Sequence, residues 1–234
     1  MSTPRDLRDP GAYAGPLSGR RAQAARNDHA ILSAARTVFL QNPHAPVAAV
    51  ATAAGVGISA LYRRYPGKEQ LLQQLCADGL RTFIAVAEQH SDAQPDPFTA
   101  LKEFVRGIVD ADVHALTVKL AGTFAPTPEL GELAARAGTL AQEIFNRAFE
   151  AGALRADADA NDIPMIFEQL TAIRLRDEAR TAALRHRYLD VLMDGLRSKQ
   201  GAEALPGPPP SSEELGERWI VPDAIMDGWP SPSP

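Results

Sequence analysis

A single stretch, residues 46–68 (PVAAVATAAGVGISALYRRYPGK), constrains the fold of this chain more than any other segment. Its first half carries apolar residues at helical spacing, which are Val47, Val50, Ala51 and Ala54. Gly55 then interrupts this pattern with the residue that most easily adopts a left-handed backbone conformation. Residues 57–65 resume the helical pattern, with Leu61 and Tyr65 on the inward face. The stretch therefore predicts two short helices joined by a tight glycine turn.

A helix-turn-helix of this kind places its second helix in the major groove of DNA. The side chains on the outward face of that second helix are Ser59, Tyr62, Arg63 and Arg64. An arginine fork matches the O6 and N7 acceptors of guanine, whereas a guanidinium on a phosphate adds affinity without selecting a sequence. We expect one of the two arginines in each role, and the sequence leaves open which is which.

Charge is distributed unevenly along the chain. The 234 residues have a formal net charge of −5, but residues 1–68 carry nine Lys or Arg and three Asp, a net charge of +6. The rest of the chain therefore carries −11. A basic end on an acidic body is typical of a protein that presents one end to phosphate, although uneven charge also occurs without such a partner.

The composition excludes several classes of protein. No apolar run approaches the roughly 18 residues that a membrane-spanning helix needs, so we expect no contact with a membrane. The single cysteine, Cys76, excludes an internal disulfide framework and a cysteine-rich zinc site, and its position among leucines predicts a buried thiol. We expect a cytoplasmic protein without cofactors.

Helical patterns continue to about residue 197, and no alternating β-type run of useful length appears, so the predicted fold is all-α. Asn27 is the expected cap of the first helix, Asn42–Pro43 its end, and Pro46 suits the first turn of the second. The predicted helices cover residues 28–41, 46–54, 57–65, 68–90, 97–112, 113–122, 128–152, 159–176 and 181–197.

Both ends of the chain read as disordered. Residues 1–24 are rich in Gly, Pro, Ser and Arg, and we expect a basic arm whose Arg20 and Arg21, with Arg26 just beyond, contact the minor groove or phosphates. A solvated tail without function is the alternative. Residues 199–234 are rich in Pro and Gly, and we expect no docking on the body, although Trp219, Ile220 and Val221 offer an apolar segment for it.

Residues 27–75 resemble the amino-terminal domain of the TetR family of transcriptional regulators (TetR/AcrR type). The similarity is carried by Ile31, Ala34, Ala35, Val38 and Phe39, by VATAAGVGISALYRRYP, and by Lys68, Glu69, Leu71 and Leu72. The segment RYLDVLMDGLR (residues 187–197) is similar to the actinobacterial branch of the family. The resemblance implies a three-helix DNA-binding domain (residues 25–75) followed by a helical bundle that binds ligand and dimerises (residues 76–198).

The resemblance also implies which residues contact DNA. In the family, the tyrosine at Tyr62 and the lysine at Lys68 bind phosphates. Four residues depart from the family pattern, namely Pro46, Gly57, Ser59 and Ala60, and Pro46 lacks the hydroxyl that usually caps the first of the two helices. The full set of expected DNA contacts is Val47, Gly57, Ser59, Ala60, Tyr62, Arg63, Arg64 and Lys68, with Arg20, Arg21 and Arg26 in the arm.

Two further surfaces follow from the resemblance, although ordinary core packing explains the same residues. The expected ligand pocket is lined by Phe83, Phe104, His114, Phe124, Phe145, Phe149 and Gln169, with Phe98, Glu143, Met165 and Phe167 as further candidates. The expected dimer interface is formed by Met165, Phe167, Leu170, Ile173, Leu184, Tyr188, Leu189 and Leu192.

The sequence contains no motif typical of an enzyme active site. The chain has no phosphate-binding glycine loop, nucleophile elbow, H-E-x-x-H motif or paired catalytic carboxylates, so we expect no enzyme. Asp110 with His114, and His186 with Asp190, stand four residues apart and would give half of a metal site, but ion pairs are far commoner at that spacing.

These observations predict a regulator that binds a pseudo-palindromic operator as a homodimer, acts as a repressor, and is released by an unidentified small molecule. Three alternatives remain open. The protein would be an activator, or a regulator without an effector, or an all-α interaction module whose helix-turn-helix has lost DNA binding.

Overall fold

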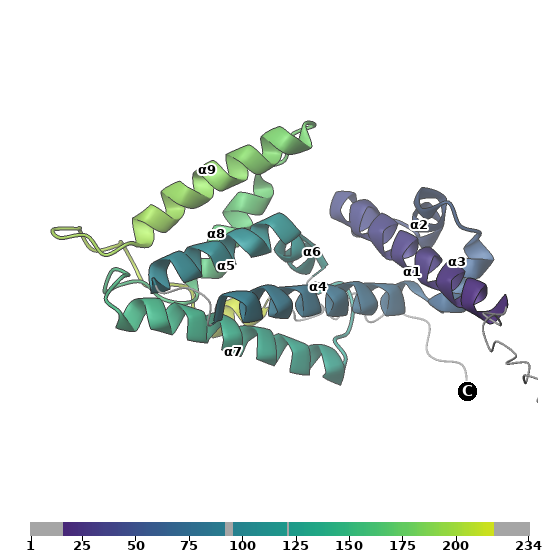
Figure 1. Ribbon diagram of the computed structural model, residues 1–234, viewed down its shortest axis with the longest axis horizontal. Coiled ribbons are helices and arrows are strands. Elements are labelled where there is room, and N and C mark those ends of the chain that lie inside the picture. Colours follow the sequence, from purple (N-terminus) through teal and green to yellow (C-terminus); the bar gives the residue numbers. More distant parts are fainter. Residues whose placement is uncertain (1–15, 92–95, 121, 218–234) are drawn as a thin grey trace, which may run out of the picture.

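The computed structural model describes residues 16–91, 96–120 and 122–217 (Figure 1). Within these ranges the chain forms helices and no strand, apart from an isolated bridge between Leu154 and Arg197, so the all-α prediction is confirmed. The helices are α1 (Pro16–Gln41), α2 (Val47–Ala54), α3 (Ile58–Arg64), α4 (Lys68–Ser91), α5 (Pro97–Ala111), α6 (Val113–Leu120), α7 (Pro128–Glu150), α8 (Asp162–Ala172), α9 (Glu178–Leu196) and α10 (Ser212–Glu217).

The turn between α2 and α3 has the predicted left-handed glycine. Gly55 lies at φ 65° and ψ 29°, and the next amide, that of Val56, donates to the Ala51 carbonyl at 3.1 Å to close the end of α2. Pro46 and Gly57 occupy the positions before α2 and α3, and neither provides a side-chain cap. The two helices are therefore held by backbone closure and by burial rather than by capping hydroxyls.

Changing Gly55 to Ala is expected to destabilise the protein by about 1 kcal/mol, because an L-residue with a side chain is strained in the left-handed region. A Cβ atom at position 55 would meet nothing within 4 Å, so this cost is purely conformational. Gly57→Ser is the matched control, since Gly57 has φ −65° and equally open space, and a serine cap would stabilise by a few tenths of a kcal/mol. Thermal unfolding of both variants measures the difference, and equal stability would contradict the account.

Two hydrophobic clusters organise the described residues. The first, here called the head core, joins α1, α2 and α3 to the first half of α4 through Phe39, Leu61 and Leu72. It also takes in Leu116 and Leu120 of α6, so this helix packs onto the head. The second, here called the body core, joins α5, α7, α8 and α9 around Phe104 and Leu170.

Helix α4 connects the two cores. Its first half contributes Leu71, Leu72 and Leu75 to the head core, and its second half contributes Ala87, with Phe83 packed alongside, to the body core. Figure 1 shows α4 running along the long axis, with α1–α3 at one end, α5 and α7 beside it, and α9 on the outer side of the body. Movement of α4 would therefore act on both parts.

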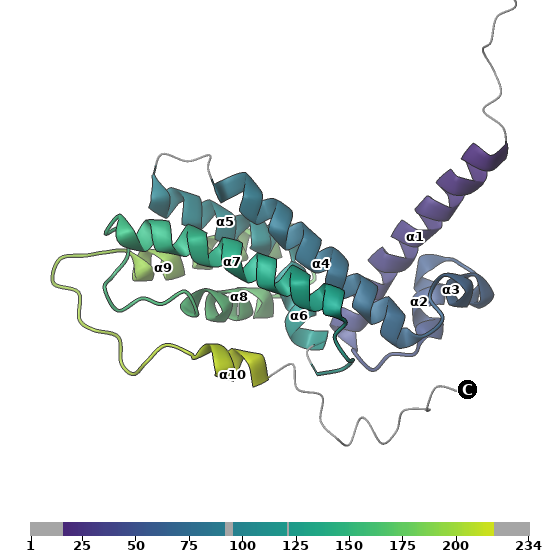
Figure 2. The same cartoon turned by 90° about the horizontal axis from the view of Figure 1, so that it is seen from below.

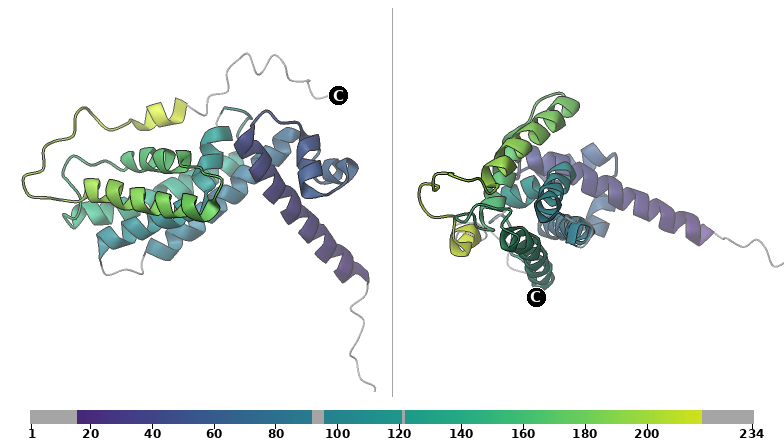
Figure 3. Two further views of the ribbon diagram at one scale, coloured as in Figure 1. Left: turned by 90° about the horizontal axis from the view of Figure 1, so that it is seen from above. Right: turned by 60° about the vertical axis from the view of Figure 1, so that its left-hand side comes forward.

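Helix α1 begins at Pro16, twelve residues before the predicted start. Asn27 is not a cap but lies inside the helix, where its side-chain oxygen accepts from Gln23 Nε2 at 2.8 Å. The amino-terminal half of α1 projects away from the rest of the described chain (Figures 2 and 3). Its sequence has no apolar stripe to signal a helix, but residues 20–26 (RRAQAAR) are all good or moderate helix formers. The prediction of disorder is corrected for residues 16–24, and residues 1–15 lie outside the described residues.

The prediction of disorder is also corrected for part of the carboxyl-terminal segment. Residues 199–217 are held to the loop between α7 and α8 by hydrogen bonds to their backbone. Arg155 donates to the Glu203 carbonyl at 2.6 Å, Asp157 accepts from the Leu205 amide at 2.7 Å, and Asn161 donates to the Pro210 carbonyl at 2.9 Å. This part of the tail therefore docks, and it includes the short helix α10. Trp219, Ile220 and Val221 lie outside the described residues.

Two simpler predictions concern the cysteine and membranes. Cys76 is buried in the head core, and this burial raises the pKa of its thiol to about 12, as expected for an unreactive structural cysteine. None of the helices in the described ranges is both long and apolar enough to cross a bilayer.

Candidate DNA-binding interface

The outer face of α3 is open to solvent. Tyr62 is 48% exposed and Ile58, one turn earlier, is 39% exposed, while Ser59 and Arg63 are exposed beside them. On the inner face Leu61 and, just after the helix, Tyr65 are buried in the head core. The helix thus presents a mixed polar and aromatic surface from a firmly anchored backbone, as a helix that enters the major groove must.

The two adjacent arginines have different environments. Arg64 makes a two-pronged contact with Asp28 of α1, with its Nε and Nη2 atoms each 2.9 Å from a carboxylate oxygen. The Tyr65 hydroxyl donates to the same carboxylate at 2.6 Å, and the Arg64 guanidinium lies 5.0 Å from the Tyr65 ring centroid. We call Asp28, Arg64 and Tyr65 the clamp, because they fasten the end of α3 to α1.

Arg63 is available for DNA. It makes no hydrogen bond or ion pair with any residue that the structure describes, and it is exposed. It borders a shallow hollow of about 290 Å³ between α1 and α3, which Asn27 and Ala60 also line. The geometry therefore separates the two arginines, since one is committed to the clamp and the other projects from the outer face.

The clamp alters the pKa values of its members. Partial burial alone would raise the pKa of Asp28, but the hydrogen bonds from Arg64 and Tyr65 outweigh it and lower that pKa below its usual value. Desolvation and the neighbouring carboxylate together raise the pKa of the Tyr65 hydroxyl, which therefore remains a donor at neutral pH. A lowered carboxylate pKa means that ionised Asp28 stabilises the folded state.

Asp28→Asn is expected to lower stability at neutral pH, and the deficit should shrink as the pH falls below about 4. The reason is that a group whose pKa is lowered on folding contributes stability above its unfolded pKa and loses it as it becomes protonated. Urea unfolding at several pH values measures the deficit. Glu132→Gln is the control, because Glu132 is exposed and makes no ion pair within the described chain. A deficit that persists or grows in acid would contradict the clamp.

Lys68 is placed at the start of α4, but its ammonium points inward. Its Nζ donates to the Pro43 carbonyl at 2.9 Å and lies 5.3 Å from the Phe39 ring centroid, and burial lowers its pKa. Lys68 thus joins α4 to the loop between α1 and α2. A phosphate at this helix start would share the ammonium with that carbonyl.

Other predicted DNA contacts are placed as follows. Val47 is 6% exposed and belongs to the head core, so this expectation is corrected: its apolar side chain packs inward at the start of α2. Gly57 is exposed and Ala60 partly exposed next to Tyr62. Arg26 is exposed on α1 and donates to Gln23 at 2.7 Å, while Arg20 and Arg21 lie on the helical backbone of α1 rather than on a disordered arm.

The predicted ligand-pocket residues lie in several different environments. Phe104 and Phe145 are buried in the body core, with Phe83 packed edge-on to Phe104 at 5.4 Å between ring centroids. His114 is partly buried and lies 5.0 Å from Phe167, whereas Gln169 and Glu143 are exposed. Phe124 belongs to the head core instead, and Phe149, 40% exposed, stacks on Phe145. Phe98 is buried and Met165 partly buried.

The residues of the predicted dimer surface also differ in exposure, since some are buried in the body core and others are exposed or partly buried. Phe167, Leu170 and Leu189 are buried inside the chain's own body core, so they have no side-chain surface left for a second copy. Tyr188 is 48% exposed, and Met165, Ile173, Leu184 and Leu192 are partly buried. Val191, 58% exposed on α9, is a further apolar side chain on this helix that the sequence prediction did not include. Its spacing from Leu184 and Tyr188, four and then three residues, is the helical signal that would have found it.

The candidate metal ligands form ion pairs between helices instead. His186 lies 2.6 Å from Asp110 of α5, and Asp190 contacts Lys102 and Arg106 of the same helix. The predicted pairing within α9 and between Asp110 and His114 is therefore replaced by contacts that join α5 to α9. No group of three or more potential ligands occurs among the residues searched, which are those the structure describes.

Comparisons with known proteins agree with this geometry. Residues 31–75 match the model of bacterial regulatory proteins of the tetR family, and residues 96–198 match that of the carboxyl-terminal domain of SbtR-like transcriptional regulators. The chain is 29% identical over 182 residues to the HTH-type transcriptional repressor LfrR of Mycolicibacterium smegmatis, which covers 77% of this chain and 92% of that protein. These families are regulators rather than enzymes.

Solved structures show the same fold. The TetR transcription regulatory protein from Mycobacterium vanbaalenii has 27% identity and a TM-score of 0.52, and the match covers 76% of this chain and 99% of that one. The structure of LfrR from Mycobacterium smegmatis in complex with proflavine has 22% identity and a TM-score of 0.50, over 77% of this chain and 98% of the other. The helix-turn-helix and both family matches together identify the chain as a member of the TetR family of DNA-binding transcriptional regulators.

Proposed function

We propose that this protein binds a pseudo-palindromic operator as a homodimer and represses transcription until a small molecule releases it. The observation that carries the proposal is the outer face of α3, where Arg63, Tyr62 and Ser59 are exposed on a helix fixed to α1 by the clamp. Arg63 would read a base edge, and the Tyr62 hydroxyl would bind a phosphate.

The exposed apolar surface of α9 supports the dimeric part of this proposal. Tyr188 and Val191 are exposed on α9, and Leu184 and Leu192 are partly exposed beside them, so the helix offers an apolar stripe to a second copy. A twofold pair of α3 helices reads two half-sites about one helical turn apart, which gives more specificity than one helix alone. We therefore assign the stripe on α9 to the dimer contact.

The sign of regulation and the response to a ligand are inferred from a relative. LfrR, at 29% identity, is a transcriptional repressor, and its structure holds proflavine. In this chain α4 belongs to both cores, so a ligand that favours one arrangement of the body would shift α4 and hence the spacing of the two reading helices. Such a ligand must bind the two arrangements with different affinity, or no shift follows.

The test is to select bound fragments from the organism's own genome and to measure their affinity at several salt concentrations. Tyr62→Phe removes only a hydroxyl, so we expect weaker binding on every sequence with no change in base preference. A reporter gene behind the selected site then gives the sign of regulation. The proposal fails if purified protein is monomeric and binds no fragment, and activation of the reporter would overturn the repressor assignment.

A further inference from the structure

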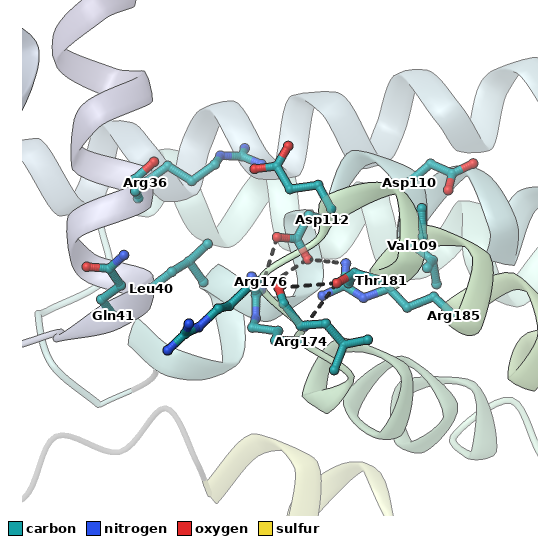
Figure 4. A pocket seen from close by; sticks show the side chains of 14 residues that line it. Arg36, Leu40, Gln41, Val109, Asp110, Asp112, Arg174, Arg176, Thr181 and Arg185 are labelled. Atoms are coloured by element: carbon teal, nitrogen blue, oxygen red, sulfur yellow. Dashed lines mark hydrogen bonds and ion pairs between the residues drawn. The ribbon is translucent and has the colours of Figure 1, made fainter.

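A polar hollow of about 590 Å³ lies between α1 and the turn that joins α8 to α9 (Figure 4). Arg36, Leu40 and Gln41 of α1 form one wall, and Asp112, at the end of α5, lies at its centre. The opposite wall comes from the α8–α9 region. The lining residues there are Arg174, Leu175, Arg176, Glu178, Thr181, Ala182 and Arg185.

Arginines dominate the charge of this hollow. Asp112 alone accepts from two of them, since Arg174 Nη2 lies 3.0 and 3.2 Å from its oxygens and Arg185 Nη1 lies 3.0 Å away. Arg185 is 7% exposed and also donates to the carbonyls of Ile173 and Thr171. Asp112 therefore pairs with two guanidinium groups. The four arginines of the hollow exceed its three carboxylates, those of Asp110, Asp112 and Glu178, by one positive charge.

The other two arginines have no carboxylate partner. Arg36 donates to the Ala111 carbonyl at 2.9 Å and makes no ion pair with a described residue. Arg176 makes neither a hydrogen bond nor an ion pair within the described ranges. The Asp110 carboxylate, which also borders the hollow, is engaged by His186 of α9. Several guanidinium N–H groups therefore remain available, and an arginine fork binds planar or tetrahedral oxyanions in two-pronged fashion.

We propose that this hollow binds a small molecule that carries a carboxylate or phosphate group, with Arg176 and Arg36 as its ligands. The volume lies within the roughly 300–1,000 Å³ typical of small-molecule sites. Leu40, Val109 and Leu175 supply apolar surface, so a ligand with both an anionic group and an apolar part fits better than a bare ion. No phenylalanine lines the hollow, which touches the body core through Val109.

The position of the hollow gives it a consequence for DNA binding. Arg36 belongs to the helix that carries Asp28 of the clamp, whereas Arg176 belongs to the body. An anion held by both arginines would link α1 to the α8–α9 turn. Because the clamp joins α1 to α3, this link would fix the orientation of α3, the helix proposed to enter the major groove. This coupling rests on the proposed function, but the anion site itself does not.

The experiment is calorimetric titration of the full chain with phenyl phosphate, benzoate and the neutral analogue benzamide. We expect the two anions to bind and benzamide to bind at least about tenfold more weakly, because charge-assisted hydrogen bonds contribute most of the affinity. The stronger of the two anions identifies the preferred group. Arg176→Gln and Arg36→Gln should each weaken anion binding about tenfold or more, while Arg180→Gln, an exposed arginine of α9 outside the hollow, should leave it unchanged.

Equal binding of phenyl phosphate by the wild-type chain and Arg176→Gln, or no anion binding at all, would overturn the site. Arg176 is the decisive position because it has no partner within the described ranges, so its replacement disturbs no contact of the folded chain. Operator affinity is then measured with and without phenyl phosphate. If phenyl phosphate changes the operator affinity of the wild-type chain and Arg176→Gln abolishes that change, the coupling is supported. If the anion binds without changing operator affinity, the coupling is overturned. If no operator is found, the calorimetric titration still tests the anion site, so failure of the proposed function can be distinguished from failure of the anion site.

Discussion

Arg63→Ala should reduce the affinity of the dimer for its operator by between about 30-fold and 20,000-fold. A two-pronged arginine–guanine contact contributes about 1–3 kcal/mol of discrimination, and the dimer would lose two of them. Arg63 is exposed on the outer face of α3 and unpaired within the described chain, so its removal should leave the fold intact. Competition binding with operators that differ at one base pair measures the loss, which should appear as a relaxed preference at one position in each half-site.

The neighbouring Arg64→Ala is the matched comparison. Arg64 is held by Asp28 at 2.9 Å through two nitrogens, so its loss would loosen α3 from α1 and lower both stability and affinity. Because Arg64 does not read a base in this arrangement, the affinity should fall alike on every sequence, with base preference unchanged. If Arg64→Ala relaxed the preference and Arg63→Ala did not, the two roles would be reversed.

The two adjacent arginines, Arg63 and Arg64, differ in a way that the local sequence could not predict. The spacing of Leu61 and Tyr65 was sufficient to predict the inner face of α3, and Gly55 was sufficient to predict the left-handed turn. The different environments of Arg63 and Arg64 depend on Asp28, which is 36 residues from Arg64 and meets it only after α1 has packed on α3. Nothing local to the pair contains that information.

The phenylalanines illustrate a second limit. Helical spacing predicted correctly that Phe104 and Phe145 lie on inward faces, but it could not separate two cores. Phe124 follows α6, and because α6 packs on the head, this ring joins Phe39 and Leu61 in the head core. Similarly, the arginines of the α1–α9 hollow come from three separate segments, so no motif in the sequence marks them.

The two segments predicted as disordered have a common explanation. Disorder was predicted from a composition rich in Gly and Pro and poor in large apolar residues. Such a composition indicates little burial, but it does not exclude local structure. Residues 16–27 form a helix through favourable propensity and side-chain contacts such as that between Gln23 and Asn27. Residues 199–217 are held by polar side chains of the α7–α8 loop, which bind backbone atoms of the tail and therefore leave no pattern in it.

Asp112 combines two unusual features, and both predict sensitivity to substitution. It is the only residue other than glycine with positive φ among those the structure describes, at φ 50°, where it ends α5. Its carboxylate is also the only ion-pair partner, within the same ranges, of Arg185, whose side chain is 9% exposed. Without this carboxylate a buried guanidinium would keep its carbonyl partners but lose its counter-charge, which is costly in a low-dielectric interior.

Asp112→Asn should therefore destabilise the protein by about 3 kcal/mol, equivalent to a fall of about 6–12 °C in Tm for a chain of this size. Asparagine tolerates the left-handed conformation, so the loss reports charge rather than backbone strain. Asp110→Asn is the control two residues earlier, because Asp110 is half exposed and pairs with the exposed His186, so its change should stay within about 0.5 kcal/mol. Adding Arg185→Met to Asp112→Asn removes the unbalanced charge and should recover part of the loss. Thermal unfolding of the wild type, the two single variants and the double variant measures these differences. If Asp112→Asn lowers the stability no more than Asp110→Asn does, the buried ion pair between Asp112 and Arg185 does not stabilise the fold.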